Sequence, residues 1–236
     1  MNIKITSEEF TLLKDDIIKT YVVGSKLYGT DNINSDEDIL VIYETIGESD
    51  IYYPNQHQLQ YDDLDNNRQY ILTTERQFFK NLFSGDSTIN LDVILFYDDC
   101  NDEQKINISR TYNIIKSLLG FAKRDIRFLK SGKSKLFHVE RGLYCAEKLL
   151  NNELPDLTEI GKLSLNNETK YLLDKCNLLR TKMNNLFESN ELTLYPKNPI
   201  CHVVSSIEKK LIESNNKKEF RYSYISRQYW CFVGSL

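Results

Sequence analysis

Residues 24–43, GSKLYGTDNINSDEDILVIY, constrain the fold more than any other stretch of the sequence. The run from Asp38 to Tyr43 is apolar enough to form a strand that is buried on both faces. Asp36 and Asp38 stand where this strand begins, and alternate residues of a strand point to the same side. Two neighbouring carboxylates repel each other, and burying both costs on the order of several kcal/mol unless a cation neutralises them. We therefore expect a charge-compensated site where this strand begins.

A divalent metal ion would neutralise this pair. Mg²⁺ prefers hard oxygen ligands and usually binds one or two carboxylates together with water and substrate phosphates. Asp92 lies in a second apolar run, Asn90–Tyr97, which we expect to be another strand, although aspartate is a poor strand former. If the two strands are neighbours, Asp92 completes a three-carboxylate cluster that can hold two metal ions about 3.5–4 Å apart.

The Gly24–Ser25 pair precedes the carboxylates and fits the same chemistry. A glycine lets the backbone approach a phosphate closely. Backbone N–H groups and the Ser25 hydroxyl can then bind the phosphate oxygens. Gly29 would permit the sharp return from this turn. The stretch therefore predicts phosphates at Gly24–Ser25 and metal at Asp36 and Asp38.

These residues resemble the signature of the DNA polymerase β nucleotidyltransferase superfamily: Gly-Ser, a short turn, an Asp-x-Asp pair that opens a strand, and a third carboxylate on a later strand. The tighter form, G-S-x-x-Y-G-T followed by S-D-x-D, is similar to a group of bacterial and phage predicted nucleotidyltransferases. In that group a helix and an acidic strand follow, where FFKNLFSGDSTINLDVILF stands here. A later helix with a histidine and an arginine also resembles the group, and FHVERGLYCAEKLL supplies His138 and Arg141.

The resemblance implies that the protein transfers a nucleoside monophosphate from an NTP to an acceptor hydroxyl with Mg²⁺ or Mn²⁺. The residues that it assigns to the NTP phosphates are Gly24, Ser25, Lys26, His138 and Arg141. The residues that it assigns to metal binding and catalysis are Asp36, Asp38 and Asp92. Asp92 is in addition a candidate for the base that takes the proton of the acceptor hydroxyl.

Each of these residues also has a simpler explanation. Asp36 and Asp38 are also compatible with a solvated turn before a strand. Asp92 could face water from an edge strand. On the later helix, His138 could be a packed histidine and Arg141 a surface arginine.

Charge divides the chain into two modules. Residues 1–100 carry 19 acids and 7 bases, whereas residues 101–236 carry 15 acids and 23 bases. We expect an α+β nucleotidyltransferase catalytic domain over 1–100, which the resemblance makes a polymerase β-like palm with a small mixed sheet flanked by helices. Long helical patterns predict a mainly helical, basic C-terminal domain over 101–236.

Periodicity and capping residues predict the individual elements. Strands are expected over 21–23, 38–43 and 90–97, and helices over 7–20, 74–83, 109–130, 134–151, 167–189 and 199–215. Residues 44–69 are interpreted as an irregular insertion. The aromatic tail, FRYSYISRQYWCFVGSL, has no clear period and is compatible with a strand, a helix or a docking segment.

The second module contains a strongly basic segment. Seven bases and two acids fall between residues 123 and 141, and Lys123, Arg127 and Lys130 share one helical face. This face would bind the phosphates of the NTP or of a polynucleotide acceptor, or it is simply solvated. The leading hypothesis for the acceptor is an RNA or tRNA 3′ end. The alternatives are nucleotidylation of a protein, in the manner of minimal nucleotidyltransferase antitoxins, and a catalytically silent nucleotide- or RNA-binding module.

The sequence also bears on location. No apolar run approaches the roughly 18–20 residues of a membrane span, so no membrane partner is expected. The opening residues, MNIKITSEEF, lack the apolar core of a signal peptide. Five irregularly spaced cysteines then indicate reduced thiols in a cytoplasm, either bacterial or, for a phage protein, that of the host.

Overall fold

A computed structural model describes residues 3–13, 17–43, 59–97, 100–129, 136–163 and 168–196. The chain divides at Pro199 into two compact units, and the described residues all belong to the first. The predicted helix over 199–215 and the aromatic tail lie outside the described residues.

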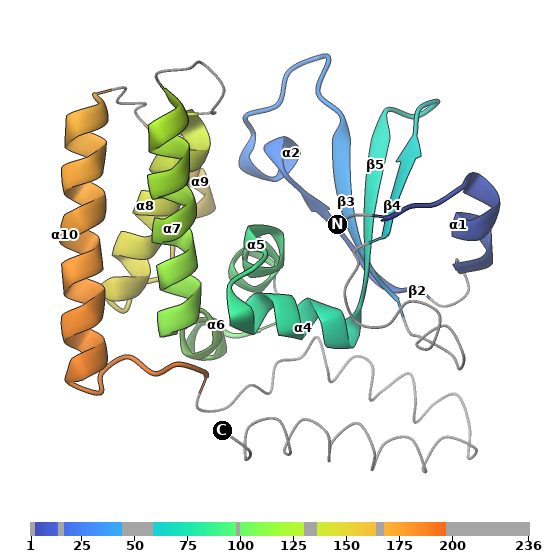
Figure 1. Cartoon of the computed structure of the whole chain (residues 1–236). Helices are drawn as coiled ribbons and strands as arrows, with labels where there is room; N and C mark the ends of the chain where they lie inside the picture. Colours follow the sequence, from blue (N-terminus) through green and yellow to red (C-terminus); the bar gives the residue numbers. More distant parts are fainter. Residues whose placement is uncertain are drawn as a thin grey trace, which may run out of the picture. The chain divides into compact units, whose positions relative to one another are not determined.

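Five strands form one mixed sheet in the order β1–β4–β5–β3–β2 (Figure 1). The strands are β1 (Ile3–Lys4), β2 (Ile17–Val23), β3 (Glu37–Tyr43), β4 (Leu59–Asp63) and β5 (Arg68–Thr74). β3 lies between β5, to which it is parallel, and β2, to which it is antiparallel. This inner position explains why Leu40, Val41 and Ile42 are completely buried. The predicted buried strand is confirmed, and so is the mixed sheet.

Helices make up most of the rest of the described chain. They are α1 (Ser7–Leu13), α2 (Ser25–Tyr28), α4 (Glu75–Ser84), α5 (Thr88–Phe96), α6 (Asp102–Ser109), α7 (Tyr112–Leu129), α8 (Leu136–Leu150), α9 (Leu157–Ile160) and α10 (Thr169–Glu188). The α+β class and the mainly helical second half are thus confirmed over these residues. No helix in the described ranges has the length and apolarity that crossing a membrane requires.

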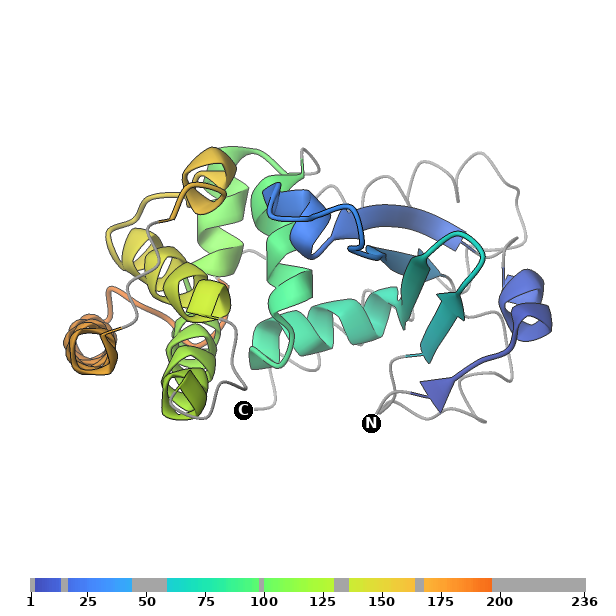
Figure 2. The same ribbon diagram turned by 90° about the horizontal axis from the view of Figure 1, so that it is seen from above.

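The three long helices α7, α8 and α10 pack on one another, while α4 and α5 contact the sheet (Figure 2). α4 also contacts α7, and α5 also contacts α6, so these two helices link the sheet to the helical half. The compact unit therefore continues to Pro199, and the boundary predicted near residue 100 falls inside it.

The predicted helix over 7–20 is too long. α1 ends at Leu13, and from Ile17 onward the chain forms β2, which pairs with β3. Phe10 packs against the rings of Tyr61 and Tyr70 and anchors α1 on the sheet. Residues 17–23 are rich in β-branched side chains, and hydrogen bonding to an apolar neighbouring strand outweighs the helical spacing of Ile17.

Part of the predicted irregular insertion belongs to the sheet. β4 and β5 form an antiparallel hairpin in which Asp63 pairs with Arg68. Its turn ends at Asn67, whose φ of 51° is a conformation that asparagine tolerates better than most residues. Asp62 and Asp63 lie on β4, whose Leu59 joins Phe10 of α1 and Leu72 of β5 in one buried cluster. Residues 44–58 lie outside the described residues.

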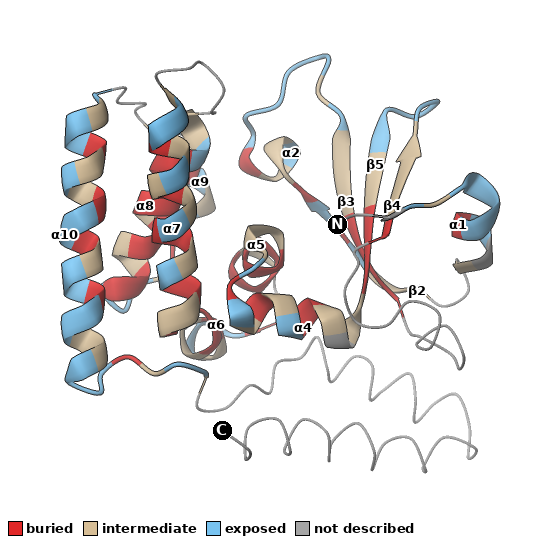
Figure 3. Cartoon of the chain, viewed as in Figure 1, coloured by how far each residue is buried: buried red, intermediate tan, exposed pale blue. Residues whose placement is uncertain are grey.

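The prediction of a strand around Asp92 is also wrong, because these residues form helix α5. Ser87 caps this helix by accepting a hydrogen bond from the Asn90 backbone N–H. All residues from Asn90 to Leu95 are buried, so α5 has no polar face (Figure 3). A short apolar run without a polar face fits a buried helix as well as a buried strand, which is why its type was misjudged.

The cysteines divide into two kinds. Cys145 and Cys176 are buried free thiols, as predicted, and burial raises the pKa of Cys145 to about 12. Cys100 is disulfide-bonded, so the prediction of reduced thiols is wrong at that position. Irregular spacing along the sequence carries no information on which cysteines meet in space.

Gly85 offers a test of how α4 meets α7. It ends α4 with a φ of 77°, and a Cβ atom there would lie 2.7 Å from both the Asn113 carbonyl oxygen and Ser117 Cβ. We expect Gly85→Ala to lower the free energy of unfolding by about 2–4 kcal/mol in urea denaturation, from backbone strain and steric overlap together.

Gly120→Ala is the matched control, because nothing lies within 4 Å of a Cβ at this position inside α7. It should raise the free energy of unfolding by about 1 kcal/mol through helix propensity. Equal effects of the two substitutions would contradict the contact between the end of α4 and α7.

Candidate functional site

A tight turn connects β2 to α2. Gly24 has φ 71° and ψ −146°, a conformation that glycine adopts readily and other residues rarely do. The four-residue helix α2 then ends at Gly29, whose φ is 64°. The Gly29 and Thr30 backbone N–H groups donate to the Lys26 and Ser25 carbonyls. The predicted sharp return at Gly29 is therefore confirmed.

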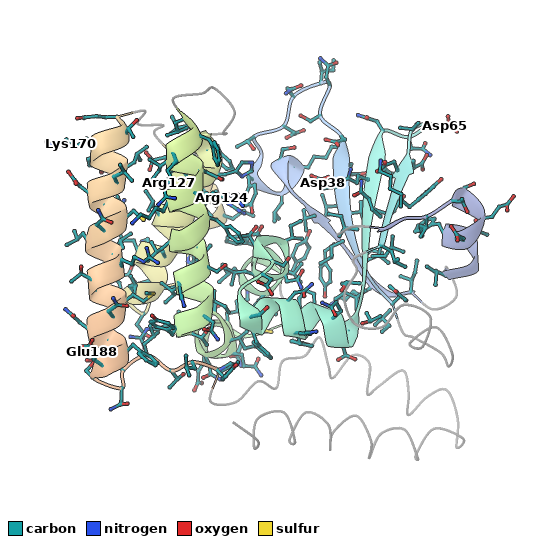
Figure 4. All side chains as sticks on the ribbon, in the orientation of Figure 1. Asp38, Asp65, Arg124, Arg127, Lys170 and Glu188 are labelled. Carbon is teal, nitrogen blue, oxygen red and sulfur yellow. The ribbon has the colours of Figure 1, made fainter. Side chains whose placement is uncertain are left out.

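The Asp38 carboxylate lies directly against this turn (Figure 4). Val23 is paired with Asp38 in the β2–β3 ladder, which brings the next residue, Gly24, alongside the start of β3. A Cβ atom at position 24 would overlap Asp38 Oδ2 and lie 3.1 Å from its Cγ. A side chain at position 24 would therefore force the Asp38 carboxylate to move. The structure thus brings together the glycine turn and the second carboxylate of the predicted site.

Asp36 and Asp38 differ in their surroundings. Asp36 precedes β3 and is exposed, whereas Asp38 is half-buried within the strand. Between them, Glu37 accepts a 2.6 Å hydrogen bond from Arg68 Nε and lies 3.5 Å from Lys26 Nζ. The hydrogen bond from Arg68 is the largest cause that lowers the pKa of Glu37. Lys26, predicted to bind NTP phosphates, thus lies at the rim of the turn beside Glu37.

Asp92 is not on a strand beside β3 but on α5, where it forms a buried ion pair with Arg141 of α8. Arg141 Nη1 donates to Asp92 Oδ2 at 2.8 Å and to Oδ1 at 3.1 Å. The Tyr28 hydroxyl, at the end of α2, donates to Asp92 Oδ2 and accepts from Arg141 Nη1. Both carboxylate oxygens are therefore hydrogen-bonded, and the predicted three-carboxylate cluster is not seen.

No group of three or more His, Cys, Asp or Glu side chains in the described ranges is arranged to hold a metal ion. Of the predicted ligands, Asp38 lies against the turn, and Asp36 lies two residues before Asp38, exposed ahead of β3. Asp92 was predicted to join them on the assumption that its strand pairs beside β3. It does not, because α5 turns its carboxylate toward α8.

Burial dominates the electrostatics of Asp92, Tyr28 and Arg141. Desolvation raises the pKa of Asp92, while the charge of Arg141 and the hydrogen bond from Tyr28 act in the opposite direction. Desolvation also raises the pKa of the Tyr28 hydroxyl, and the Asp92 charge adds to the effect, so this hydroxyl stays neutral. Burial disfavours the charge of Arg141, but attraction to Asp92 outweighs it and raises the pKa of Arg141. The three groups stabilise one another in a site with little water.

His138 and Arg141, the two residues of α8 predicted to bind NTP phosphates, differ in exposure. Arg141 is buried against Tyr28, with its guanidinium carbon 5.0 Å from the ring centroid. His138, one turn earlier, is exposed. Phe137, its neighbour, packs on the Tyr28 ring with centroids 5.5 Å apart. The start of α8 therefore covers the end of α2, with His138 at the surface.

Two members of the predicted basic face, Lys123 and Arg127, lie in the C-terminal half of α7. Arg127 is exposed and Lys123 is half-buried one turn earlier. Arg124 is exposed between them and pairs with Asp125 at 2.7 Å (Figure 4). Lys130, the third member of the predicted basic face, lies outside the described residues.

Sequence reasoning missed the role of Tyr28. This residue is the tyrosine of G-S-x-x-Y-G-T, but the motif alone assigns no role to it. Its place in the pattern, three residues after Ser25, was the available signal. In the structure it joins the turn to both Asp92 and Arg141.

Comparison with known proteins does not assign a family or a function to the chain. No protein-family model matches the chain, and no curated protein matches it. The interpretation of the site therefore depends on its residues and their geometry.

The contact between Gly24 and Asp38 can be tested by substitution. Gly24→Ala should lower the free energy of unfolding by about 3 kcal/mol or more, because positive φ and overlap with Asp38 add together. Gly29→Ala is the matched control: its φ is also positive, but nothing lies within 4 Å of a Cβ there. Its cost should be about 1–2 kcal/mol. Equal losses in urea denaturation would contradict the close approach of Asp38.

Proposed function

We propose that the protein is a metal-dependent nucleotidyltransferase, built on a polymerase β-like palm, that transfers a nucleoside monophosphate from an NTP to an acceptor hydroxyl. One observation carries the proposal: the Gly24–Ser25 turn lies against the Asp38 carboxylate at the start of a buried strand. The spacing of G-S-x-x-Y-G-T and S-D-x-D supports it. Phosphate groups and metal ligands are needed side by side in this chemistry.

The turn supplies the phosphate-binding groups. The missing side chain of Gly24 admits the Asp38 carboxylate, and the backbone N–H groups at the start of α2, next to it in the chain, would bind a phosphate. The Ser25 hydroxyl and the Lys26 ammonium add a hydrogen-bond donor and a positive charge beside them. Together these groups would orient the triphosphate with its α-phosphorus toward the acceptor.

Asp36 and Asp38 suit Mg²⁺ or Mn²⁺, because both are carboxylates and Asp38 lies against the turn that would hold the phosphates. A bound ion would neutralise their repulsion and draw charge from the reacting phosphate. Asp92 does not suit this role, since Arg141 and Tyr28 occupy both its oxygens. A two-ion site would need another oxygen donor, and we do not assign Asp92 as the base.

The acceptor that fits the charge distribution is the hydroxyl of an RNA end. Residues 101–236 carry 23 bases against 15 acids, and Arg127 is exposed near the end of α7. A polyanion is attracted to such a surface, whereas the acidic first hundred residues would repel it.

A labelling experiment tests the function. The protein is incubated with Mg²⁺ or Mn²⁺, with each α-labelled NTP in turn, and with total RNA or lysate protein. Label on RNA supports the proposal, and label on protein identifies nucleotidylation of a protein instead. No label on either acceptor, together with no metal-dependent NTP binding, would contradict enzymatic function.

The two carboxylates can be tested individually. Asp36→Asn and Asp38→Asn should each lower transfer by about 100-fold or more, because each removes a metal ligand. Their melting temperatures should stay close to that of the unaltered protein, because each substitution also removes repulsion.

Asp65→Asn is the matched control, since Asp65 is exposed in the β4–β5 turn (Figure 4). It should leave transfer unchanged. Wild-type rates in Asp36→Asn and Asp38→Asn would show that the metal site has been misplaced.

Substitution of Arg127 tests whether α7 binds a polynucleotide acceptor. Arg127→Ala should weaken binding to oligouridine and reduce the slope of log K against log salt by about 0.7, the value for one phosphate contact on a single strand. Lys170→Ala removes an exposed charge from α10 and should have a smaller effect. An unchanged salt slope in Arg127→Ala would mean that this face of α7 is only solvated.

A further inference from the structure

We infer that Arg141 and Asp92 are positioning residues that act through Tyr28 to set the geometry of the Gly24–Ser25 turn. Arg141 is thereby assigned to holding the turn and not to contacting NTP phosphates. This inference rests on the proposed function, because it concerns the turn that would bind the triphosphate.

The connection between Tyr28 and the turn is short and stiff. α2 comprises four residues, with Ser25 at its start and Tyr28 at its end. Gly24 precedes it and Gly29 follows it, and the Gly29 and Thr30 backbone N–H groups close the turn by donating to the Lys26 and Ser25 carbonyls. A displacement of Tyr28 therefore moves Ser25 with it, because no flexible residue separates them.

Residues of α5 and α8 hold the side chain of Tyr28 in place. The hydroxyl donates to Asp92 and accepts from Arg141, so it satisfies both charged groups at once. The ring packs against Phe137 and, edge to face, against Phe96. Tyr28 is only 5% exposed as a result.

The backbone of Tyr28 is held as well. A Cβ atom on Gly161, at the end of α9, would lie 2.7 Å from the Tyr28 carbonyl oxygen. The α9 backbone thus lies directly against the end of α2. α5, α8 and α9 all contact Tyr28, and these contacts together restrict the movement of α2.

Arg141 directs Nη1 into the buried contact with Tyr28 and Asp92, and little of its side chain reaches solvent. Nη1 makes its hydrogen bonds to Tyr28 and to both Asp92 oxygens. Nε is buried without a hydrogen-bond partner among the described residues. An arginine that bound the triphosphate would present its donors to solvent, whereas the Arg141 side chain is 10% exposed.

The test compares two tyrosines whose hydroxyls each hydrogen-bond a carboxylate. Tyr28→Phe removes the hydroxyl between Asp92 and Arg141, and Tyr144→Phe removes one that donates to Glu159. Binding of magnesium tripolyphosphate is measured by calorimetry, because this ligand tests the phosphate turn without a base. We expect Tyr28→Phe to weaken binding about 10-fold or more, and Tyr144→Phe to change it less than about twofold.

Arg141→Lys provides the second variant. It keeps a positive charge opposite Asp92, but its shorter side chain lacks the terminal nitrogen that Arg141 places between Tyr28 and both carboxylate oxygens. It should also weaken tripolyphosphate binding about 10-fold, while oligouridine binding stays at the wild-type level. A merely structural role would lower both affinities together, in proportion to the loss of folded protein.

The outcomes separate this inference from the proposed function. If the wild-type protein binds tripolyphosphate and the folded Tyr28→Phe and Arg141→Lys variants bind it equally well, the positioning role is overturned and the proposed function stands. If the wild-type protein does not bind it, the phosphate turn itself is misassigned and both proposals fall.

Discussion

The buried ion pair between Asp92 and Arg141 is the interaction on which the site depends. It joins α5 to α8, and through the Tyr28 hydroxyl it also joins α2, so segments far apart in the sequence meet at one point. Burying two charges is costly, and the cost is offset only when the hydrogen bonds are complete. Removing one partner would leave an uncompensated charge and cost about 3–5 kcal/mol. This polar contact adds to the packing of α4 on α7 and of α5 on α6, and it tolerates little change.

The carboxylates divide into two roles. Asp38 lies against the Gly24 turn at the edge of the sheet, where phosphates and a metal ion would meet. Asp92 lies deeper and is committed to Arg141. We propose that the first group carries the chemistry and the second sets its geometry. Such support is expected, because a site built on a short turn needs fixed neighbours to hold reacting groups in place.

Local features could be predicted from the sequence, and long-range pairing could not. The buried strand β3 follows from its continuous apolar run, and the end of α4 from Ser84–Gly85. α5 was misjudged because it is buried on all sides and so has no helical period, although Ser87 stands at its start as an N-cap. The ion pair between Asp92 and Arg141 joins residues on two helices, and no spacing in one sequence indicates that they meet.

The most direct measurement is a crystal structure of the protein with Mn²⁺ and an NTP analogue that cannot be cleaved between its α- and β-phosphates. We expect anomalous density for Mn²⁺ beside Asp36 and Asp38, the triphosphate on the Gly24–Ser25 turn, and an unchanged Asp92–Arg141 pair. Mn²⁺ bound to Asp92, or a triphosphate held by Arg141 away from the turn, would contradict the proposed site.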